Sequence, residues 1–282
     1  MKSYNAVVFA GGGSRCLWQV GFWETLSAEQ QLEPSVVSGV SAGAAMACLV
    51  MAGRGSDGLR EFMDMTAANR GNAYPVNLFR KEPVFPHFDM YTDIILKMID
   101  NDAFERIKSG PALRIMLTRA PGFLGARSAT FTGLLAYLVE KHTTHPVHPV
   151  LALKLGFTPE IVDARECRDP RELADLILSS SCTPPFVPVM RWKNRIALDG
   201  GLVDNVPLSA IDGSEREGGA LILLTRQYRQ ERIPVAPHLT YVQPSKEIPV
   251  GKWDYTSPQG LKDAYDLGRR DAETFLRSNE QK

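Results

Sequence analysis

The chain has 282 residues, of which 44% are hydrophobic and 23% are charged, an ordinary composition for a globular protein. This length suits one large domain or two small ones and allows a sizeable core. The 32 Lys and Arg residues balance the 32 Asp and Glu residues, so net charge gives no electrostatic reason to expect a nucleic-acid partner.

The first fifty residues alternate between strand and helix signals. Ala6–Phe9 is a short apolar run that ends at a glycine cluster, which predicts a buried strand. A helix should follow, because apolar residues recur every four positions from Trp18 onward. Val36–Val37 predicts a second strand and Ala42–Met51 a second helix. This order indicates a parallel sheet covered by helices.

The next part of the chain surrounds an irregular segment. Ser56–Asn69 and Asp89–Ile107 both have helical apolar spacing. Between them, Gly71–Phe88 holds three prolines and four aromatic residues without a clear period. We therefore treat residues 71–110 as a candidate lid or substrate-access segment, whose aromatic part meets lipid at a membrane surface. The alternative is a loop packed on the core.

The second half of the chain continues the alternation. A helix should begin at Asp169, the N-cap, with Pro170 in its first position. We see no internal repeat and no linker, so residues 1–282 are expected to form a single α/β domain. Further strands are expected at Leu113–Thr118, up to Asp163, at Arg195–Leu198 and at Ala220–Leu224, and a closing helix at Gly260–Arg277.

A serine lies between two glycines where the second strand turns into the second helix. Gly39-Val40-Ser41-Ala42-Gly43 matches G-x-S-x-G, in which the glycines relieve the crowding of a very tight turn. The hydroxyl of Ser41 would then be exposed at a helix N-terminus, where unpaired N–H groups favour developing negative charge. The pattern therefore predicts a nucleophile; a turn of small residues before a helix is the alternative.

Three successive glycines follow the first strand. The N–H groups of Gly11, Gly12 and Gly13 can point into one cavity and bind an anion, which favours an oxyanion hole. A dinucleotide loop fits poorly, because Cys16 occupies its last glycine position and no acidic residue ends the Val36–Val37 strand. A nucleotide P-loop lacks its Lys-Ser/Thr pair, and a purely structural turn stays open.

Asp199 ends a predicted strand and is followed by Gly200 and Gly201. Such Asp-Gly pairs are usually turns. Together with the serine and glycine motifs, however, Asp199 supplies the base that a serine nucleophile requires.

In these three motifs the chain resembles the patatin-like phospholipases. The resemblance implies a three-layer α/β/α hydrolase of lipid acyl esters that needs no catalytic histidine, metal or cofactor. It implies Ser41 as the nucleophile, Asp199 as the base, and an oxyanion hole in the glycine loop, formed by Gly11, Gly12, Gly13, Ser14 and Arg15. We also expect transient contact with a membrane surface. Cys16 departs from the family, where a further glycine is usual. The motifs that carry the resemblance are Gly11-Gly12-Gly13-Ser14-Arg15, Gly39-Val40-Ser41-Ala42-Gly43 and Asp199-Gly200-Gly201, with Asn205 and Pro207 beyond.

Two other functions remain open. Ser41, Asp199 and His238 occur in the chain order of an ordinary Ser-Asp-His triad, although His238 begins a strand-like segment. A non-catalytic lipid- or acyl-binding protein would keep the loops without turnover. We expect Asn205 and Pro207 to shape the loop after Asp199 rather than to contact substrate.

Metal binding and secretion are not expected. His142, His145 and His148 are three residues apart, but intervening prolines break the helix that would align them, so a solvated loop is favoured. The four cysteines show no C-x-x-C spacing and predict free thiols in a reducing compartment. With no apolar run near 18 residues and no signal-peptide core, we expect a cytoplasmic protein, peripheral at membranes.

Overall fold

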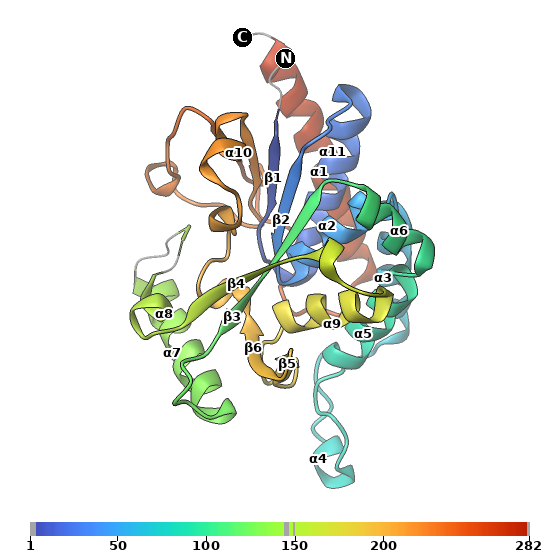
Figure 1. Cartoon of the computed structure of the whole chain (residues 1–282). Helices are drawn as coiled ribbons and strands as arrows, with labels where there is room; N and C mark the ends of the chain where they lie inside the picture. The colour runs from blue at the N-terminus through green and yellow to red at the C-terminus, as the bar shows by residue number, and fades with distance from the viewer. Residues whose placement is uncertain (1–3, 144–146, 149, 281–282) are drawn as a thin grey trace.

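The computed structural model describes residues 4–143, 147–148 and 150–280 and is built on one mixed sheet (Figure 1). In this described part the sheet has eight strands in the order β5-β6-β3-β2-β1-β7-β8, with β4 paired to β3. The strands are β1 (Ala6–Phe9), β2 (Val36–Val40), β3 (Ala112–Arg119), β4 (Thr158–Asp163), β5 (Met190–Trp192), β6 (Arg195–Asp199), β7 (Ala220–Leu223) and β8 (Leu239–Val242).

The sheet is mostly parallel, and its central strands are buried on both faces. β1 pairs in parallel with β2 and β7, as β2 does with β3 and β7 with β8, whereas β4, β5 and β6 join antiparallel. Along β1, Val7 and Phe9 enter one apolar cluster, and Ala6 and Val8 enter another on the opposite face. Such two-sided burial requires cover on both faces.

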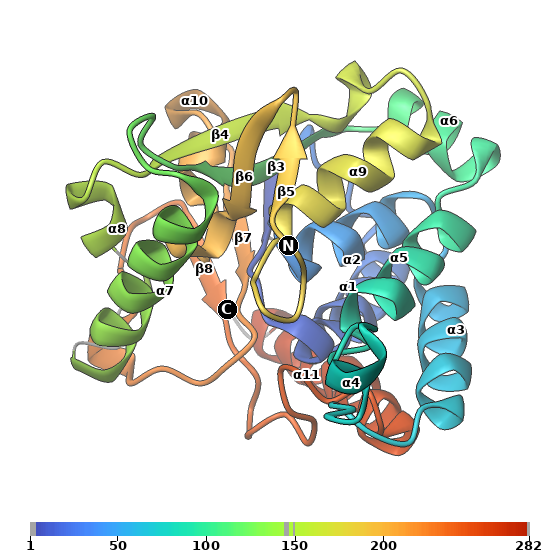
Figure 2. The same cartoon turned by 90° about the horizontal axis from the view of Figure 1, so that it is seen from below.

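Helices supply that cover, and the three-layer α/β/α arrangement expected from the sequence is confirmed. Figure 2, the view from below, shows α1, α2, α3, α5, α9 and α11 on one side of the sheet and α7, α8 and α10 on the other. The helices are α1 (Leu17–Gln30), α2 (Ala42–Met51), α3 (Gly55–Ala68), α4 (Asn77–Arg80), α5 (His87–Met98), α6 (Asn101–Ser109), α7 (Ala126–Thr143), α8 (Leu151–Lys154), α9 (Pro170–Ser180), α10 (Gly213–Glu217) and α11 (Pro258–Glu280). None of these described helices is both long enough and apolar enough to cross a bilayer.

Two expected elements differ from the structure. The helix expected over Asp89–Ile107 is two helices, because Asp100 accepts the N–H of Ala103 as the N-cap of α6 and so ends α5. The segment Gly71–Phe88 is irregular as predicted except for the single turn of α4 and the start of α5. The helices α7, α8 and α10 and the strand β5 were not predicted.

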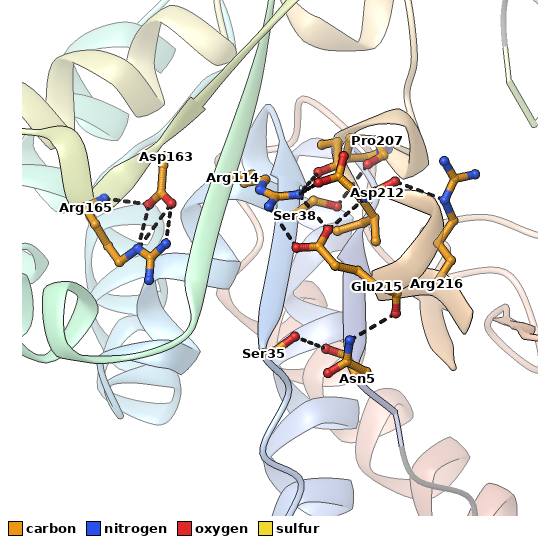
Figure 3. A network of polar contacts seen from close by, with 12 residues as sticks. Asn5, Ser35, Ser38, Arg114, Asp163, Arg165, Pro207, Asp212, Glu215 and Arg216 are labelled. Carbon is orange, nitrogen blue, oxygen red and sulfur yellow. Dashed lines mark hydrogen bonds and ion pairs between the residues drawn. The ribbon is translucent and has the colours of Figure 1, made fainter. Parts of the chain in front are cut away.

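A polar network fixes the loop that follows β6 (Figure 3). Arg114 on β3 donates to both carboxylate oxygens of Glu215 at 2.7 and 2.8 Å and to the carbonyl of Ala210 at 2.7 Å. Ser38 on β2 donates to the carbonyl of Pro207 at 3.0 Å. Paired forks of this kind are strong and directional. The chain beyond Asp199 is therefore held against the middle of the sheet.

Candidate functional site

Strand pairing along β3 brings Ser41 and Asp199 together. β4 pairs with Arg114–Arg119, so β2 and β6 must share the other edge of β3. On that edge β2 ends with Val40 opposite Met116, and β6 ends with Asp199 opposite Leu117. Two strands approaching from opposite directions thus end at adjacent positions. The Oγ of Ser41, the next residue after β2, donates to Oδ2 of Asp199 at 2.8 Å.

Ser41 has the backbone conformation that the G-x-S-x-G pattern predicts. Its φ is 55°, a left-handed value that costs a non-glycine residue about 1–3 kcal/mol. A Cβ on Gly39 would lie 2.7 Å from Cα of Ala44, and one on Gly43 would lie 2.5 Å from the carbonyl oxygen of Ala10. Only glycine fits at these two positions. The strained turn places Ser41 as the N-cap of α2.

The carboxylate of Asp199 is buried and fully engaged. Besides the Ser41 hydroxyl, Oδ2 accepts from Oγ1 of Thr183 at 2.8 Å, and Oδ1 accepts from the N–H of Gly201 at 2.8 Å. A Cβ on Gly200 would meet the carbonyl of Met116 at 2.4 Å, so the turn after Asp199 lies directly against β3. These contacts hold Oδ2 toward the serine.

The glycine loop lies against Ser41, because a Cβ added to Gly11 would be 3.4 Å from the Cβ of Ser41. The N–H of Gly11 donates to the carbonyl of Asn205 at 3.0 Å, and that of Ser14 donates to the carbonyl of Lys252 at 3.1 Å. Within the described residues, the N–H groups of Gly12 and Gly13 have no acceptor. Of the four N–H groups from Gly11 to Ser14, these two are therefore the ones left without a hydrogen-bond acceptor in the described part of the chain.

Asn205 clamps this loop rather than only shaping the turn after Asp199. Its Nδ2 donates to the carbonyl of Gly11 at 3.1 Å, while its own carbonyl accepts the Gly11 N–H. Oγ1 of Thr225 donates to the same Gly11 carbonyl at 2.7 Å. Nε of Arg15 donates to the carbonyl of Gly12 at 3.4 Å. The guanidinium group of Arg15 therefore lies beside the glycine loop.

Cys16, which departs from the family pattern, is accommodated in the core. Its Sγ lies 3.6 Å from the carbonyl of Ala10, and burial raises the pKa of its thiol to about 12. Cys182 lines the cavity beside Asp199, and burial likewise raises the pKa of its thiol to about 12. Burial thus disfavours the thiolate, the nucleophilic form of cysteine, at both positions.

The histidine alternatives fail on position. His238 is exposed, and its carbonyl accepts the N–H of Ala220 at the start of β7. It therefore lies at the β8 edge of the sheet, at the opposite end of the parallel strands from Ser41. His148 lies in a loop, as expected, but its side chain is half-buried and contacts Asp204 at 2.9 Å and Tyr241 at 3.2 Å. His145 lies outside the described residues. Within those residues, no cluster of three or more His, Cys, Asp or Glu side chains has the arrangement of a metal site.

A cavity of about 310 Å³ lies beside Asp199. Its wall is mainly apolar and includes a stacked pair, Phe186 and Trp253, with ring centroids 4.5 Å apart. Leu134 and Leu138 of α7 line another side. Such a surface suits a hydrocarbon chain whose polar end reaches the serine.

Similarity to known proteins identifies the family of this chain. A family model described as patatin-like phospholipase matches residues 7–212. The chain belongs to the patatin-like phospholipase family. No curated protein matches it in sequence. Among solved structures, VipD from Legionella pneumophila aligns with 96% of this chain and 67% of its own, at 10% identity and a TM-score of 0.46, a likeness too distant to inform function.

Membership in the patatin-like phospholipases places this chain among hydrolases that act on lipid esters. Ser41, Asp199 and the glycine loop all lie within the matched residues. Thr183 and Ser180 also lie there, and both were missed by sequence reasoning. Ser180 accepts the N–H of Ser41 at 2.8 Å and donates to the carbonyl of Met116 at 2.6 Å. The run of three serines at the end of α9 was the available signal.

Proposed function

We propose that this protein is a serine lipid acyl hydrolase of the phospholipase A or lysophospholipase type. The observation that carries the proposal is the 2.8 Å hydrogen bond from Oγ of Ser41 to Oδ2 of Asp199, beside the unoccupied amides of Gly12 and Gly13. A hydroxyl hydrogen-bonded to a carboxylate, next to a loop that has backbone N–H groups without an acceptor in the described residues, matches the requirements of acyl transfer.

The reaction would proceed through an acyl-enzyme. Oγ of Ser41 attacks the ester carbonyl while its proton passes to Oδ2 of Asp199, and the N–H groups of Gly12 and Gly13 bind the oxyanion. Collapse breaks the ester C–O bond, and the departing alcohol takes the proton from Asp199. Water then gives a proton to Asp199 and attacks the acyl carbon. The second collapse returns the proton to Ser41 and frees the fatty acid.

A carboxylate base is sufficient only with strong oxyanion stabilisation. In water a carboxylate is a weaker base than imidazole by roughly 2.6 pKa units, or about 3.5 kcal/mol. A single well-placed oxyanion donor contributes about 2.7–4 kcal/mol. The amides of Gly12 and Gly13, with the N-terminus of α2 beneath Ser41, therefore compensate for the weaker base.

The test is covalent labelling followed by location of the label. A fluorophosphonate should modify the protein at one site per chain, and peptide mass spectrometry should place it on Ser41. Hydrolysis of phospholipids, lysophospholipids and p-nitrophenyl esters by the same preparation then ranks the substrates. A protein that binds these lipids but neither reacts with the label nor releases fatty acid would be the non-catalytic lipid-binding alternative.

We also propose that residues 71–86 form the part of the chain that meets the lipid surface. The wider segment 71–110 narrows to this range, because Tyr91, Ile95 and Phe104 of α5 and α6 are buried in the core. Figure 1 shows α4 projecting from the body of the protein. Its exposed apolar side chains are Val76, Leu78 and Phe79, the last 90% exposed.

This projecting segment connects to the cavity through aromatic contacts. Phe85, at its base, packs edge-on against Phe186 of the cavity wall, with centroids 4.8 Å apart. The N–H of Tyr74 donates to the carbonyl of Val84 at 2.8 Å and closes the segment into a hairpin-like loop. The base of the projecting segment is thus in contact with the wall of the proposed acyl site.

Replacing Phe79 with serine should weaken binding to phospholipid vesicles by about tenfold or more. Transfer of a fully exposed Phe side chain into lipid contributes about 1.5–3 kcal/mol. Vesicle sedimentation measures the binding, and hydrolysis of a soluble short-chain ester should keep its wild-type rate. Val235→Ser, a change at a residue 95% exposed before β8, is the matched control. Equal losses on vesicles and soluble ester, or equal effects of the two variants, would refute the role of this segment.

A further inference from the structure

Residues 180–183, at the end of α9 and just beyond it, contact both members of the proposed dyad. Figure 2 shows α9 beside β5 and β6, and the helix packs against both strands. Oγ of Ser180 accepts the N–H of Ser41 at 2.8 Å. The carbonyl of Cys182 accepts the N–H of Asp199 at 2.9 Å, and Oγ1 of Thr183 donates to Oδ2 of Asp199 at 2.8 Å. One short segment therefore holds the nucleophile and the base at the same time.

Ser180 connects β2 and β3 at the point where their ladder ends. The last paired residues of these strands are Val40 and Met116, so Ser41 lies beyond the ladder. Besides accepting the N–H of Ser41, Oγ of Ser180 donates to the carbonyl of Met116 at 2.6 Å. Ser180 is fully buried, and without its hydroxyl both backbone groups would lose this partner. A side chain of α9 thus supports the strained backbone of Ser41.

Thr183 acts on the oxygen that would receive the serine proton. Oδ2 of Asp199 accepts two hydrogen bonds, one from Ser41 and one from Thr183, both at 2.8 Å. With both lone pairs of this oxygen engaged, the carboxylate has one favoured orientation. Without Thr183, the hydroxyl that Oδ2 must deprotonate would be its one remaining hydrogen-bond donor among the described residues.

Ser180 lies between two other serines that make different contacts. Oγ of Ser179 is buried and has no hydrogen-bond partner among the described residues. Oγ of Ser181 lies 3.2 Å from the hydroxyl of Tyr91 on α5. Of these three described hydroxyl groups, that of Ser180 is therefore the one that reaches the dyad. Ser179 offers the same side chain, one residue away, as a control.

We propose that Ser180 and Thr183 are positioning residues of the acyl hydrolase, which hold Ser41 and Asp199 in the geometry that proton transfer requires. This inference rests on the proposed function and adds two residues to its machinery. Ser180 acts through the backbone of the nucleophile, and Thr183 acts through the carboxylate of the base. A small displacement of reacting groups lowers the rate steeply, so the loss of either hydroxyl should lower kcat more than it raises KM.

Thr183→Val should lower kcat for a soluble p-nitrophenyl ester by about 10–100-fold, the range for one hydrogen bond to a charged group. Valine keeps the shape of the side chain in the cavity wall, so KM should stay close to its wild-type value. Thr183→Ser restores the hydroxyl and should regain most of the rate. Thr66→Val is the matched control, because it makes the same change at a buried threonine whose hydroxyl donates within α3.

The sign of the change separates positioning from an effect of charge alone. A carboxylate that loses a hydrogen-bond donor accepts a proton more readily, so an effect of charge alone predicts a higher rate in Thr183→Val. Unchanged or higher kcat in this variant would overturn the role of Thr183. An equal loss in Thr183→Ser would overturn it as well, because the hydroxyl would then not be the cause.

Ser180→Ala is tested against Ser179→Ala by rate and by hydrogen exchange. In Ser180→Ala, kcat should fall by about tenfold or more, and the Ser41 amide, followed by NMR, should exchange about tenfold faster or more. Ser179→Ala should change neither. Melting temperatures establish which variants are folded at the temperature of the assay, and if Ser180→Ala does not fold, the Thr183 variants decide the proposal. Equal exchange and equal rates in the two folded variants would contradict the role of Ser180.

The proposed function and the positioning role can fail separately. If the wild type hydrolyses esters and reacts with the fluorophosphonate, unchanged kcat in Thr183→Val and Ser180→Ala would keep the hydrolase and remove the positioning role. If the wild type does neither, the hydrolase and the catalytic part of this proposal are both removed. Faster exchange of the Ser41 amide in Ser180→Ala would then still show that Ser180 supports the turn at Ser41.

Discussion

Replacing Asp199 with asparagine should lower kcat/KM for a soluble p-nitrophenyl ester by about 10³-fold, close to the loss in Ser41→Ala. Asparagine keeps the size of the side chain, and its Oδ1 can still accept the N–H of Gly201. What it loses is the capacity to take the Ser41 proton, because an amide is not a base at neutral pH. A general base contributes about 10²–10⁴-fold to such reactions. Steady-state rates and the rate of fluorophosphonate labelling should fall together.

Two variants separate this effect from general damage. Asp204→Asn removes another buried carboxylate in the same loop, one that contacts His148 and Ser209 but not Ser41. It should change kcat/KM by less than about tenfold. His238→Ala should leave the rate unchanged, since His238 lies at the far edge of the sheet. A loss in His238→Ala comparable with that in Ser41→Ala would instead revive the Ser-Asp-His triad, and wild-type rates in Asp199→Asn would exclude Asp199 as the base.

The parts of the site predicted from sequence are those determined by local sterics. The helix predicted over Ala42–Met51 begins and ends as predicted, because a turn with glycines at positions 39 and 43 permits no other start. The positive φ of Ser41 follows from the same crowding. Helix α9 likewise starts at Pro170, where an N-cap aspartate and a first-turn proline specify it.

Non-local pairing explains what sequence alone left undetermined. That β6 meets β3 with Asp199 opposite Leu117 is a matter of register between segments about 80 residues apart. No local pattern specifies such a register, so the pairing of Ser41 with Asp199 was predicted only from the combination of the three motifs and from the family resemblance. The contacts of Ser180 with Ser41 and of Asn205 with Gly11 were missed for the same reason, since they span 139 and 194 residues.

Helix α7 was missed because its apolar residues do not all lie on one buried face. Phe131 and Leu135 are 70% and 50% exposed, while Leu134 and Leu138 line the cavity. A helix apolar on several sides gives a weak periodic signal. The exposed apolar surface beside the proposed acyl cavity agrees with a protein that acts on lipid esters.

Replacing Gly13 with alanine should lower kcat by about 10²–10³-fold with little change in KM. The φ of Gly13 is +60°, and a Cβ there would lie 2.1 Å from the carbonyl oxygen of Lys252, the acceptor of the Ser14 N–H. The loop must therefore move away from Lys252 and take the amides of Gly12 and Gly13 with it. Because those amides contact the oxyanion but not the bound ester, the loss falls on kcat, at the size expected for one donor.

Gly213→Ala is the matched control, because a Cβ at that position has no heavy atom within 4 Å. Its kcat and melting temperature should equal those of the wild type, while Gly13→Ala is compared at a temperature where its own melting curve shows the folded protein. The same loss should appear in the rate of fluorophosphonate labelling, since the phosphonyl oxygen requires the same donors. If folded Gly13→Ala hydrolysed esters at the wild-type rate, the oxyanion donors would have to lie elsewhere, with the first amides of α2 beside Ser41 as the remaining source.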